Sequence, residues 1–272
     1  GGAGGPRGVR TRDFDILCVI GMGAYGRVLQ VRHKRNRKVY AMKVISKALL
    51  RKKNHISYMQ AERDIMTKVD HPFVVGLKCS FQTPEKMFLI MDYMPGGELF
   101  FHLDREGFIL EEVARFYVAE LTLALEFLHS IHIIHRDLKP ENVLVCHDGH
   151  VCLGDLGLAK HRRDARTGGW RACRTLCGTD SYVAPETLRR DRYGPSADVW
   201  QFGCFVFELF AGRSPFFGAA DEDPRAARRA ALEGRWDCPE GLPADARDLI
   251  GRLLPPEPLQ RLGVVPAPSG PA

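Results

Sequence analysis

The chain has no long apolar run of the kind that spans a membrane. A spanning helix needs roughly 18 consecutive apolar residues. The longest candidate, VWQFGCFVFELFAG at Val199–Gly212, is shorter and contains Gln201 and Glu208. The opening stretch, GGAGGPRGVRTRD, lacks the apolar core of a signal peptide. We therefore expect no membrane span, and we interpret Val199–Gly212 as part of a buried core helix.

Cysteines in paired spacings are also missing. The sequence contains eight cysteines, and they are scattered along its length. This pattern favours a reduced protein over one held together by a disulfide framework. We therefore expect an intracellular location, in the cytoplasm or the nucleus.

Signatures of nucleic-acid recognition are absent, although the net charge is +6. Basic residues cluster at Arg32–Lys38 and Lys47–Lys53, but no aromatic residues alternate with them as stacking platforms. No zinc-ligand or RRM-like motif occurs either. We interpret the basic runs as solvated turns or faces and do not expect nucleic acid as a partner. A basic nucleic-acid binder is the alternative, and its affinity would fall steeply with salt.

The sequence does contain enough apolar residues for one large domain or for two lobes that share a cleft. They make up 45% of the 272 residues. The first part predicts mainly strands: strand, glycine-rich turn and strand over Phe14–Val31, a strand at Lys38–Ile45, a helix from about Ser57 to Val69, and strands around Val74–Ser80 and Met87–Met91.

Helices dominate after the turn-forming stretch MPGGEL at Met94–Leu99. A long amphipathic helix, opened by acidic residues, is predicted at Glu111–Ser130. The apolar run near the end of the chain predicts a buried helix at Pro195–Gly212.

These elements predict an α+β fold of two lobes joined by a hinge near Asp92–Met94. Residues 14–93 are expected to form a small β-rich lobe, and residues 94–263 a larger, mostly helical lobe. Residues 1–13 and 264–272 are rich in glycine, proline or alanine and are predicted to be disordered.

A glycine-rich stretch, GMGAYGRV at Gly21–Val28, fits the pattern G-x-G-x-x-G-x-V. Dinucleotide-binding folds share its first six positions, but there the turn opens a helix, whereas here RVLQV continues as a strand. Such a loop closes over phosphates, and the following strand would bring Lys43 to their oxygens. Glu62, on the next predicted helix, is expected to hold Lys43 through an ion pair. The alternatives are a surface lysine and an exposed glutamate.

The strongest signal is HRDLKPEN at His135–Asn142, followed by the triplet Asp155-Leu156-Gly157. In-line phosphoryl transfer needs positioning and charge neutralisation more than covalent chemistry. Asp137 would accept the proton of the substrate hydroxyl, and Lys139 would hold the transferring phosphate. Asn142 and Asp155 supply the oxygen ligands that Mg²⁺ prefers. ATP and Mg²⁺ are therefore the expected cofactors.

From Phe14 to Gly263 the chain resembles eukaryotic serine/threonine protein kinases. The segments HPFVVGLKCSFQTPEKMFLIMDYMPGGELFFHL, ARFYVAEL, TLCGTDSYVAPE and LLPPEPLQRLG are similar to those of the AGC group. Within it, the ribosomal protein S-six kinase, Akt and serum/glucocorticoid-regulated kinase branches are the most similar, and a ribosomal protein S-six kinase-related protein is the expectation. KPEN after the catalytic aspartate points to serine or threonine as the acceptor.

The resemblance implies a bilobal protein kinase fold with its active site in the cleft. It places Met91 at the gatekeeper position, and Asp92 and Met94 where hinge backbone groups meet adenine. The nucleotide is expected to lie against Gly21, Met22, Gly23, Ala24, Tyr25, Gly26, Arg27, Val28, Ala41, Lys43, Glu62 and Leu144.

The resemblance also implies regulation by phosphorylation. Thr175 matches the activation-loop phosphosite, which an upstream kinase would modify and Arg136 would bind through a bidentate contact. Further expected contacts are a bridge by Thr179 between Asp137 and Lys139, a buried ion pair of Glu186 with Arg261, and an anchor for the catalytic-loop backbone at Asp198.

Three carboxylates match positions at which basophilic relatives bind arginines upstream of the target residue. They are Glu98, Glu141 and Glu208. Opposite charges in a cleft select by attraction, and like charges reject acidic peptides. The expected partners are therefore protein substrates with serine or threonine near arginine or lysine. The alternative is that Glu208 only solvates a helix end.

Two departures from the family pattern bear on activity. Leu156 replaces a phenylalanine that packs between Met66, Leu77 and His135, and the lost volume would cost the active packing roughly 1–2 kcal/mol. Asp180 and Ser181 replace the common proline and glutamate in the loop that receives the substrate. The prediction is a working kinase, and the alternative is a pseudokinase that acts as a nucleotide-binding scaffold.

Overall fold

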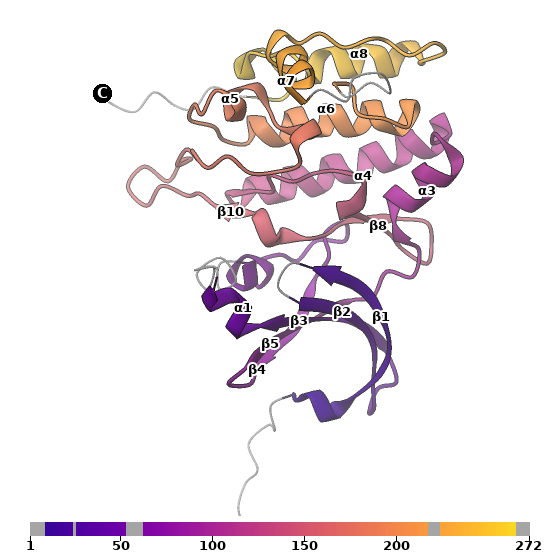
Figure 1. Ribbon diagram of the computed structural model, residues 1–272, viewed down its shortest axis with the longest axis vertical. Helices are drawn as coiled ribbons and strands as arrows, with labels where there is room; N and C mark the ends of the chain where they lie inside the picture. The colour runs from indigo at the N-terminus through magenta and orange to yellow at the C-terminus, as the bar shows by residue number, and fades with distance from the viewer. Residues whose placement is uncertain (1–8, 24–25, 53–61, 217–223, 265–272) are drawn as a thin grey trace, which may run out of the picture.

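The computed structural model describes residues 9–23, 26–52, 62–216 and 224–264. Figure 1 shows a lobe built on a twisted sheet from the first part of the chain and a larger lobe of stacked helices from the rest. The chain leaves the sheet where strand β5 (Lys86–Asp92) ends and passes to the short strand β6 (Gly97–Glu98). The predicted α+β fold of two lobes is confirmed.

The small lobe contains a five-stranded sheet in the order β1-β2-β3-β5-β4, in which all neighbours are antiparallel. Its other strands are β1 (Phe14–Gly23), β2 (Gly26–His33), β3 (Val39–Ser46) and β4 (Leu77–Gln82). Aromatic and β-branched residues form these strands, as their strand preference leads one to expect. One face buries a cluster that includes Phe14, Val31, Met42, Phe88 and Ile90.

The strand predicted at Val74–Ser80 was placed too early, because β4 begins at Leu77. Val74 and Val75 instead pair with the large lobe: Val74 forms a parallel bridge with Leu153, and the Val75 amide donates to the Leu153 carbonyl at 2.9 Å. Their β-branched side chains suit extended backbone in either place. Sequence preference could not show that the partner strand lies in the other lobe.

Helices on the small lobe are short where the structure describes them. Helix α1 covers Lys47–Lys52, and residues 62–66 are helical and carry Glu62. The predicted helix at Ser57–Val69 is thus seen in part, since residues 57–61 lie outside the described residues. Within the predicted disordered segment 1–13, Thr11–Asp13 form the 3-10 helix η1.

The large lobe stacks its helices in layers, with α4 next to α6 and α8 beyond them (Figure 1). Helix α4 (Glu111–Ser130) has the predicted bounds, and its first turn carries Glu111 and Glu112, which favours the positive end of the helix dipole. The remaining helices are α3 (Leu99–Glu106), α5 (Pro185–Leu188), α6 (Ser196–Ala211), α7 (Pro224–Glu233) and α8 (Ala244–Leu253).

Helix α6 is the buried helix that the apolar run predicted. It ends at Ala211 and is followed by Gly212, whose φ of 65° is left-handed. A Cβ at this position would lie 2.1 Å from the carbonyl oxygen of Gly107. Only glycine can therefore close the helix there. Among the described residues, no helix is long and apolar enough to cross a membrane.

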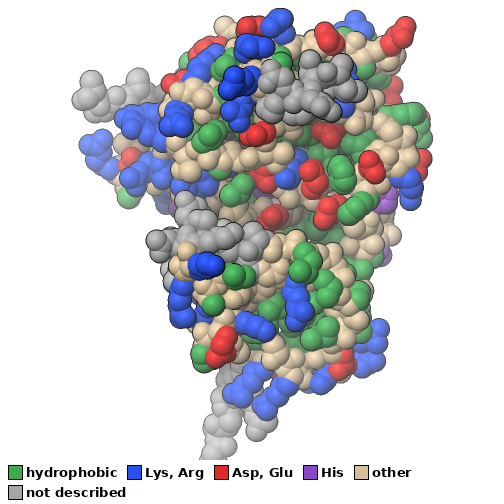
Figure 2. All heavy atoms as spheres, viewed as in Figure 1, with side chains coloured by type: hydrophobic (Ala, Val, Ile, Leu, Met, Phe, Trp, Pro, Cys, Tyr) green, Lys and Arg blue, Asp and Glu red, His purple; other side chains and the backbone are tan. Residues whose placement is uncertain are grey.

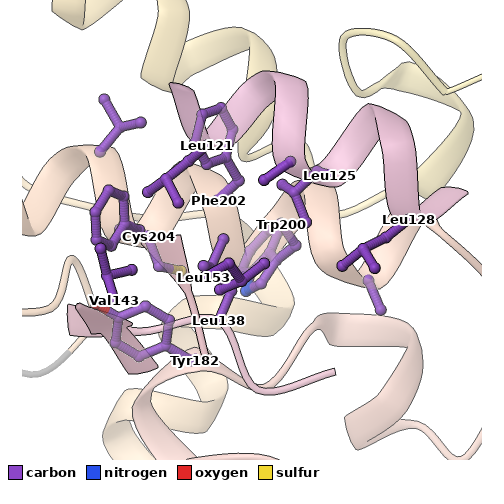
Figure 3. Close-up of a cluster of buried hydrophobic side chains, with 14 of the residues drawn as sticks. Leu121, Leu125, Leu128, Leu138, Val143, Leu153, Tyr182, Trp200, Phe202 and Cys204 are labelled. Atoms are coloured by element: carbon purple, nitrogen blue, oxygen red, sulfur yellow. The ribbon is translucent and has the colours of Figure 1, made fainter. Parts of the chain in front are cut away.

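Two small sheets carry the chemistry-bearing loops beside α4, on the side of the large lobe that faces the small lobe (Figure 1). Strand β8 (Val143–Val145) pairs with β6 on one side and with β9 (Val151–Leu153) on the other, and β7 (Ile133–Ile134) pairs with β10 (Lys160–His161). Figure 3 shows the packing beneath them, where Leu121, Leu125 and Leu128 of α4 face Trp200 and Phe202 of α6 together with Leu138, Val143 and Leu153. The loops thus rest on a continuous apolar core.

Candidate active site

The described residues of the glycine-rich stretch belong to two strands: Gly21–Gly23 end β1, and Gly26–Val28 begin β2. Gly21 pairs with Val28 and Val28 with Lys43, so the first glycine, the valine and the lysine form one row across three strands. Gly26 lies so close to β3 that a Cβ on it would be 1.8 Å from the Val44 carbonyl oxygen. Glycine is therefore required at the start of β2. Met22 and Arg27 pair at the exposed end of the turn, Gly23 pairs with Gly26, and Ala24 and Tyr25 lie outside the described residues.

Lys43 joins the two lobes through its ammonium group. Its Nζ lies 2.7 Å from Glu62 Oε1 and 3.1 Å from Asp155 Oδ1. Burial disfavours the ammonium, but the two carboxylates outweigh it and hold the pKa of Lys43 above its ordinary value. In turn, burial would raise the pKa of Asp155, but Lys43 outweighs it and holds that pKa below its ordinary value. Lys43 and Asp155 are thus both charged near neutral pH.

The predicted adenine-facing residues come from both lobes. Ala41 of β3 is buried and pairs with Met91 of β5, so the two lie side by side on neighbouring interior strands of the sheet. Leu144, in β8 of the large lobe, is half-buried, and its Cδ1 lies within 3.4 Å of a Cβ built on Gly154. Asp92 ends β5, and Met94 follows in the connection, where the Gly97 amide donates to its carbonyl at 3.2 Å.

Asp137 is the centre of the hydrogen-bond network in the large lobe. Its Oδ1 accepts from the hydroxyl and the backbone amide of Thr179, at 3.0 and 3.1 Å. Lys139 Nζ lies 2.7 Å from the Thr179 hydroxyl and 3.5 Å from Asp137 Oδ2. The predicted bridge by Thr179 between Asp137 and Lys139 is therefore present in the geometry.

Asn142 lies on the other side of the same carboxylate. Its side-chain amide donates to Asp137 Oδ2 at 3.0 Å and to the Asp137 carbonyl at 2.6 Å, which leaves its oxygen to accept. The Gly154 amide donates to the Asn142 carbonyl at 2.7 Å, so Asp155 is one residue from that contact. An amide oxygen and a half-exposed carboxylate fit a hard cation such as Mg²⁺. Within the described part of the chain, no three or more His, Cys, Asp or Glu side chains lie together where they could hold a metal ion.

The backbone around Asp137 is anchored from below by Asp198 of α6. Asp198 is fully buried and accepts from the His135 amide at 2.8 Å and the Arg136 amide at 2.7 Å. His129 Nε2 lies 2.8 Å from the same carboxylate. Burial would raise the pKa of Asp198, but His129 and these contacts outweigh it and keep that pKa below its ordinary value. The predicted anchor is present.

Arg136 does not contact Thr175 directly. Its guanidinium donates to the Leu158 carbonyl at 2.7 Å and the Tyr193 hydroxyl at 3.1 Å, and that hydroxyl donates to the Thr175 carbonyl at 2.7 Å. The Thr175 side chain is exposed, and Lys160 Nζ lies 3.5 Å from its hydroxyl. Sequence reasoning missed Tyr193, because only the fold brings this residue of the α5–α6 loop to the activation segment.

The three predicted substrate carboxylates influence one another electrostatically. Burial and then the Glu141 charge raise the pKa of Glu98. Burial raises the pKa of Glu208, and the Glu141 charge adds to it, although the Tyr182 hydroxyl donates to Glu208. Figure 2 shows acidic side chains where the two lobes meet, within a surface that is otherwise rich in lysine and arginine. A cationic group entering there would meet concentrated negative charge.

The departures from the family pattern lie in ordered surroundings. Leu156 is buried, with 3% of its surface exposed, in the same core cluster as Met66, and Leu77 packs against that cluster. Asp180 Oδ1 lies 3.4 Å from Arg228 of α7, so part of the added charge in the substrate loop is paired. The predicted pair of Glu186 with Arg261 is present as two contacts of 2.8 and 2.7 Å.

Comparison with known proteins agrees with this geometry. The family model described as protein kinase domain matches residues 14–269. The chain is 42% identical over 259 residues to serine/threonine-protein kinase AtPK2/AtPK19 of Arabidopsis thaliana, covering 95% of the chain and 53% of the relative. It is 44% identical over 252 residues to serine/threonine-protein kinase Sgk2 of Homo sapiens, covering 92% and 67%.

A third relative, serine/threonine-protein kinase YPK1 of Saccharomyces cerevisiae, is 42% identical over 253 residues, which is 92% of the chain and 36% of the relative. The chain thus spans about half the length of the plant relative it matches. Relatives of this kind confirm the predicted resemblance to the AGC group. Protein kinases generally use ATP and Mg²⁺ and act on protein substrates. The chain belongs to the protein kinase domain family.

Proposed function

We propose that the chain is the catalytic domain of a serine/threonine protein kinase, which transfers the γ-phosphoryl group of MgATP to Ser or Thr hydroxyls near arginine or lysine. The observation that carries the proposal is the single carboxylate of Asp137, which Thr179, Lys139 and Asn142 surround at hydrogen-bond or ion-pair distance. A base and a phosphate-binding cation held this close suit proton removal beside a transferring phosphate.

In this proposal each side chain has one role. Asp137 accepts the proton of the substrate hydroxyl, and Lys139 neutralises charge on the transferring phosphate. Asn142 and Asp155 would hold Mg²⁺, which would supply positive charge to the phosphate oxygens when bound. Lys43 reaches the other phosphate oxygens and is kept charged and in place by Glu62. The residues proposed to enclose the rest of the nucleotide are Gly21, Met22, Gly23, Ala24, Tyr25, Gly26, Arg27, Val28, Ala41, Met91, Asp92, Met94 and Leu144.

A basic substrate context is proposed from the coupled carboxylates. Glu98, Glu141 and Glu208 would each accept from a guanidinium, whose planar fork suits carboxylates. Partial burial of Glu98 and Glu208 raises the value of such a pairing, since an opposite charge relieves their unfavourable burial.

Regulation is proposed at Thr175. Its exposed side chain is accessible to an upstream kinase, and a phosphate there would lie close to Lys160. The eight cysteines are all free thiols, which supports the proposed intracellular location.

The pseudokinase reading is not favoured. The relatives' names describe serine/threonine protein kinases, and Leu156 is buried in the apolar core. Asp155, the residue whose loss would remove metal binding, is present and paired with Lys43.

The proposal is tested by phosphate transfer from radiolabelled MgATP to an arrayed library of Ser and Thr peptides. We expect incorporation into peptides with arginine or lysine before the acceptor, and a weaker preference in Glu98→Gln and Glu141→Gln proteins. Incorporation that favours acidic peptides, or none into any peptide while MgATP still binds, would contradict the proposal.

A further inference from the structure

Gln201 is a polar residue in the middle of the most apolar helix of the chain. It lies in α6 between Trp200 and Phe202, and only 3% of its surface is exposed. A primary amide buried this deeply is costly unless its donor and acceptor atoms are both used. The sequence offers no partner near it, so its partners must come from another element.

Both partners of Gln201 lie in the catalytic loop. Its Oε1 accepts from the Leu138 amide at 3.1 Å, and its Nε2 donates to the Arg136 carbonyl at 3.0 Å. Because one partner is an N–H and the other a carbonyl, only one orientation of the side-chain amide satisfies both. Arg136 and Leu138 are the neighbours of Asp137 on either side. The Gln201 side chain therefore hydrogen-bonds to the backbone both before and after the proposed base.

This contact is distinct from the anchor at Asp198. Asp198 accepts from the amides of His135 and Arg136, which both precede Asp137. Arg136 also has a φ of 72°, an unfavourable left-handed conformation for a residue with a side chain. Among the described residues, the Gln201 amide is the side chain that binds the Arg136 carbonyl and the Leu138 amide, which fixes the direction in which the chain leaves this strained residue.

The same amide lies against the segment that carries Thr179. Gly178 has a φ of 103°, and a Cβ built on it would lie 3.0 Å from the Arg136 carbonyl oxygen and 3.4 Å from Gln201 Nε2. Thr179 follows directly and donates to Asp137. Gln201 therefore lies beside the place where Gly178 passes the Arg136 carbonyl, one residue before Thr179 meets Asp137.

We propose that Gln201 is a positioning residue that sets the orientation of the Asp137 carboxylate by binding the backbone on both sides of it. The inference rests on the proposed function for its catalytic consequence, but its structural content is independent of turnover. A shift of about 1 Å in a reacting group can lower the rate about a hundredfold. Loss of the two Gln201 hydrogen bonds should therefore reduce kcat and leave nucleotide binding unchanged.

The test uses Gln201→Met, which keeps length and volume but removes both hydrogen bonds, with Cys204→Ala as the control. Cys204 is fully buried in the same helix, and its side chain forms no hydrogen bond to the catalytic loop within the described residues, so its truncation measures the effect of disturbed packing around α6. We expect kcat of Gln201→Met to fall about 10- to 100-fold with KM for ATP within about twofold of the wild-type value. A kcat within twofold of that of Cys204→Ala would overturn the proposal.

The conservative variant Gln201→Glu adds a second measurement, the pH dependence of kcat, which a change in packing alone would not alter. In Gln201→Glu the neutral acid can still donate to the Arg136 carbonyl, whereas the ionised form places a carboxylate against that carbonyl. Burial keeps such an acid neutral to unusually high pH. We expect kcat relative to the wild type to fall as pH rises in this variant, and a flat ratio would count against the role.

Backbone amide hydrogen exchange tests the contact of Gln201 with the catalytic loop even if no phosphate transfer is found. In Gln201→Met the Leu138 amide loses its acceptor and should exchange at least about tenfold faster, whereas the Arg136 amide remains bound to Asp198 and serves as the internal reference. An unchanged exchange rate of the Leu138 amide would refute the proposed hydrogen bond from this amide to Gln201. If the Leu138 amide exchanges faster in Gln201→Met but the wild type transfers no phosphate, the hydrogen bond to Gln201 is supported and the proposed function is rejected.

Discussion

The buried pair of Arg261 and Glu186 gives the sharpest prediction on stability. Arg261 is fully buried, and all five of its N–H donors are used. One bond goes from Nε to the Pro255 carbonyl, two go from Nη1 to Glu186 and the Ser196 carbonyl, and two go from Nη2 to Glu186 and the Pro256 carbonyl. The guanidinium also stacks 5.0 Å from the centre of the Trp200 ring. The segment after α8 is therefore tied to α5 and α6 through one side chain.

Replacing Arg261 by Met would leave the Glu186 carboxylate buried without its partner. Removal of one member of a buried ion pair costs about 3–5 kcal/mol. For a domain of this size each kcal/mol lowers Tm by about 2–4 °C, so we expect a loss of roughly 6–20 °C. The double change of Glu186→Leu with Arg261→Met removes the unpaired charge, and it should cost less than the sum of the two single changes.

The assay is thermal unfolding followed by tryptophan fluorescence, with Arg252→Met as the control. Arg252 forms an exposed pair with Asp248 on α8, and such pairs contribute about 0–1 kcal/mol. A Tm for Arg261→Met that is no lower than that of the control would refute the reasoning. Additive losses in the double variant would refute the part that depends on the unpaired charge.

Three further predictions concern pH and the glycine-rich turn. The pKa values of Glu98 and Glu208 are raised, so these carboxylates become protonated at a higher pH than an ordinary glutamate. As pH falls, KM for an arginine-containing peptide should therefore begin to rise while the pH is still above the ordinary pKa of Glu. Glu98→Gln should flatten that rise, and an unchanged KM profile in this variant would count against the role of Glu98. Asp198, whose pKa is depressed from 3.8, adds stability that is present above that value and is lost as pH falls through the lower folded value. The Tm difference between the wild type and Asp198→Asn should therefore shrink below about pH 3.8, and a constant difference would contradict this. Gly26→Ala should lower Tm and ATP affinity, because its Cβ would meet the Val44 carbonyl, whereas Gly23→Ala, with the nearest atom 4.0 Å away, should affect Tm less; equal Tm losses would contradict it.

Much of the candidate site could be predicted from the sequence because its residues lie in short motifs. Asp137, Lys139 and Asn142 share one loop, so their proximity follows from the local chain. The contact of Lys43 with Glu62 needed only the family pattern and a strand followed by a helix. The bounds of α4 followed from its apolar period and its acidic first turn.

What the sequence could not reveal depends on contacts between distant segments. Val74 and Val75 have the composition of a strand, and only the folded chain shows that they pair with Leu153. Tyr193 and Gln201 are unremarkable in the sequence, and each becomes important because the packing of α6 brings it to the catalytic loop. Local preference carries no information on such long-range partners.

The central claim, phosphoryl transfer at this site, is tested most directly by comparing wild type with Asp155→Asn. Phosphate transfer from MgATP to an arginine-containing Ser peptide would be measured, with Asp104→Asn, an exposed change on α3, as the control. We expect transfer by the wild type and the control. In Asp155→Asn we expect the rate of transfer to fall about a hundredfold or more, since no carboxylate at this position would balance the charge of the bound Mg²⁺. Equal transfer by Asp155→Asn, or a wild type that binds MgATP and transfers nothing, would contradict the account.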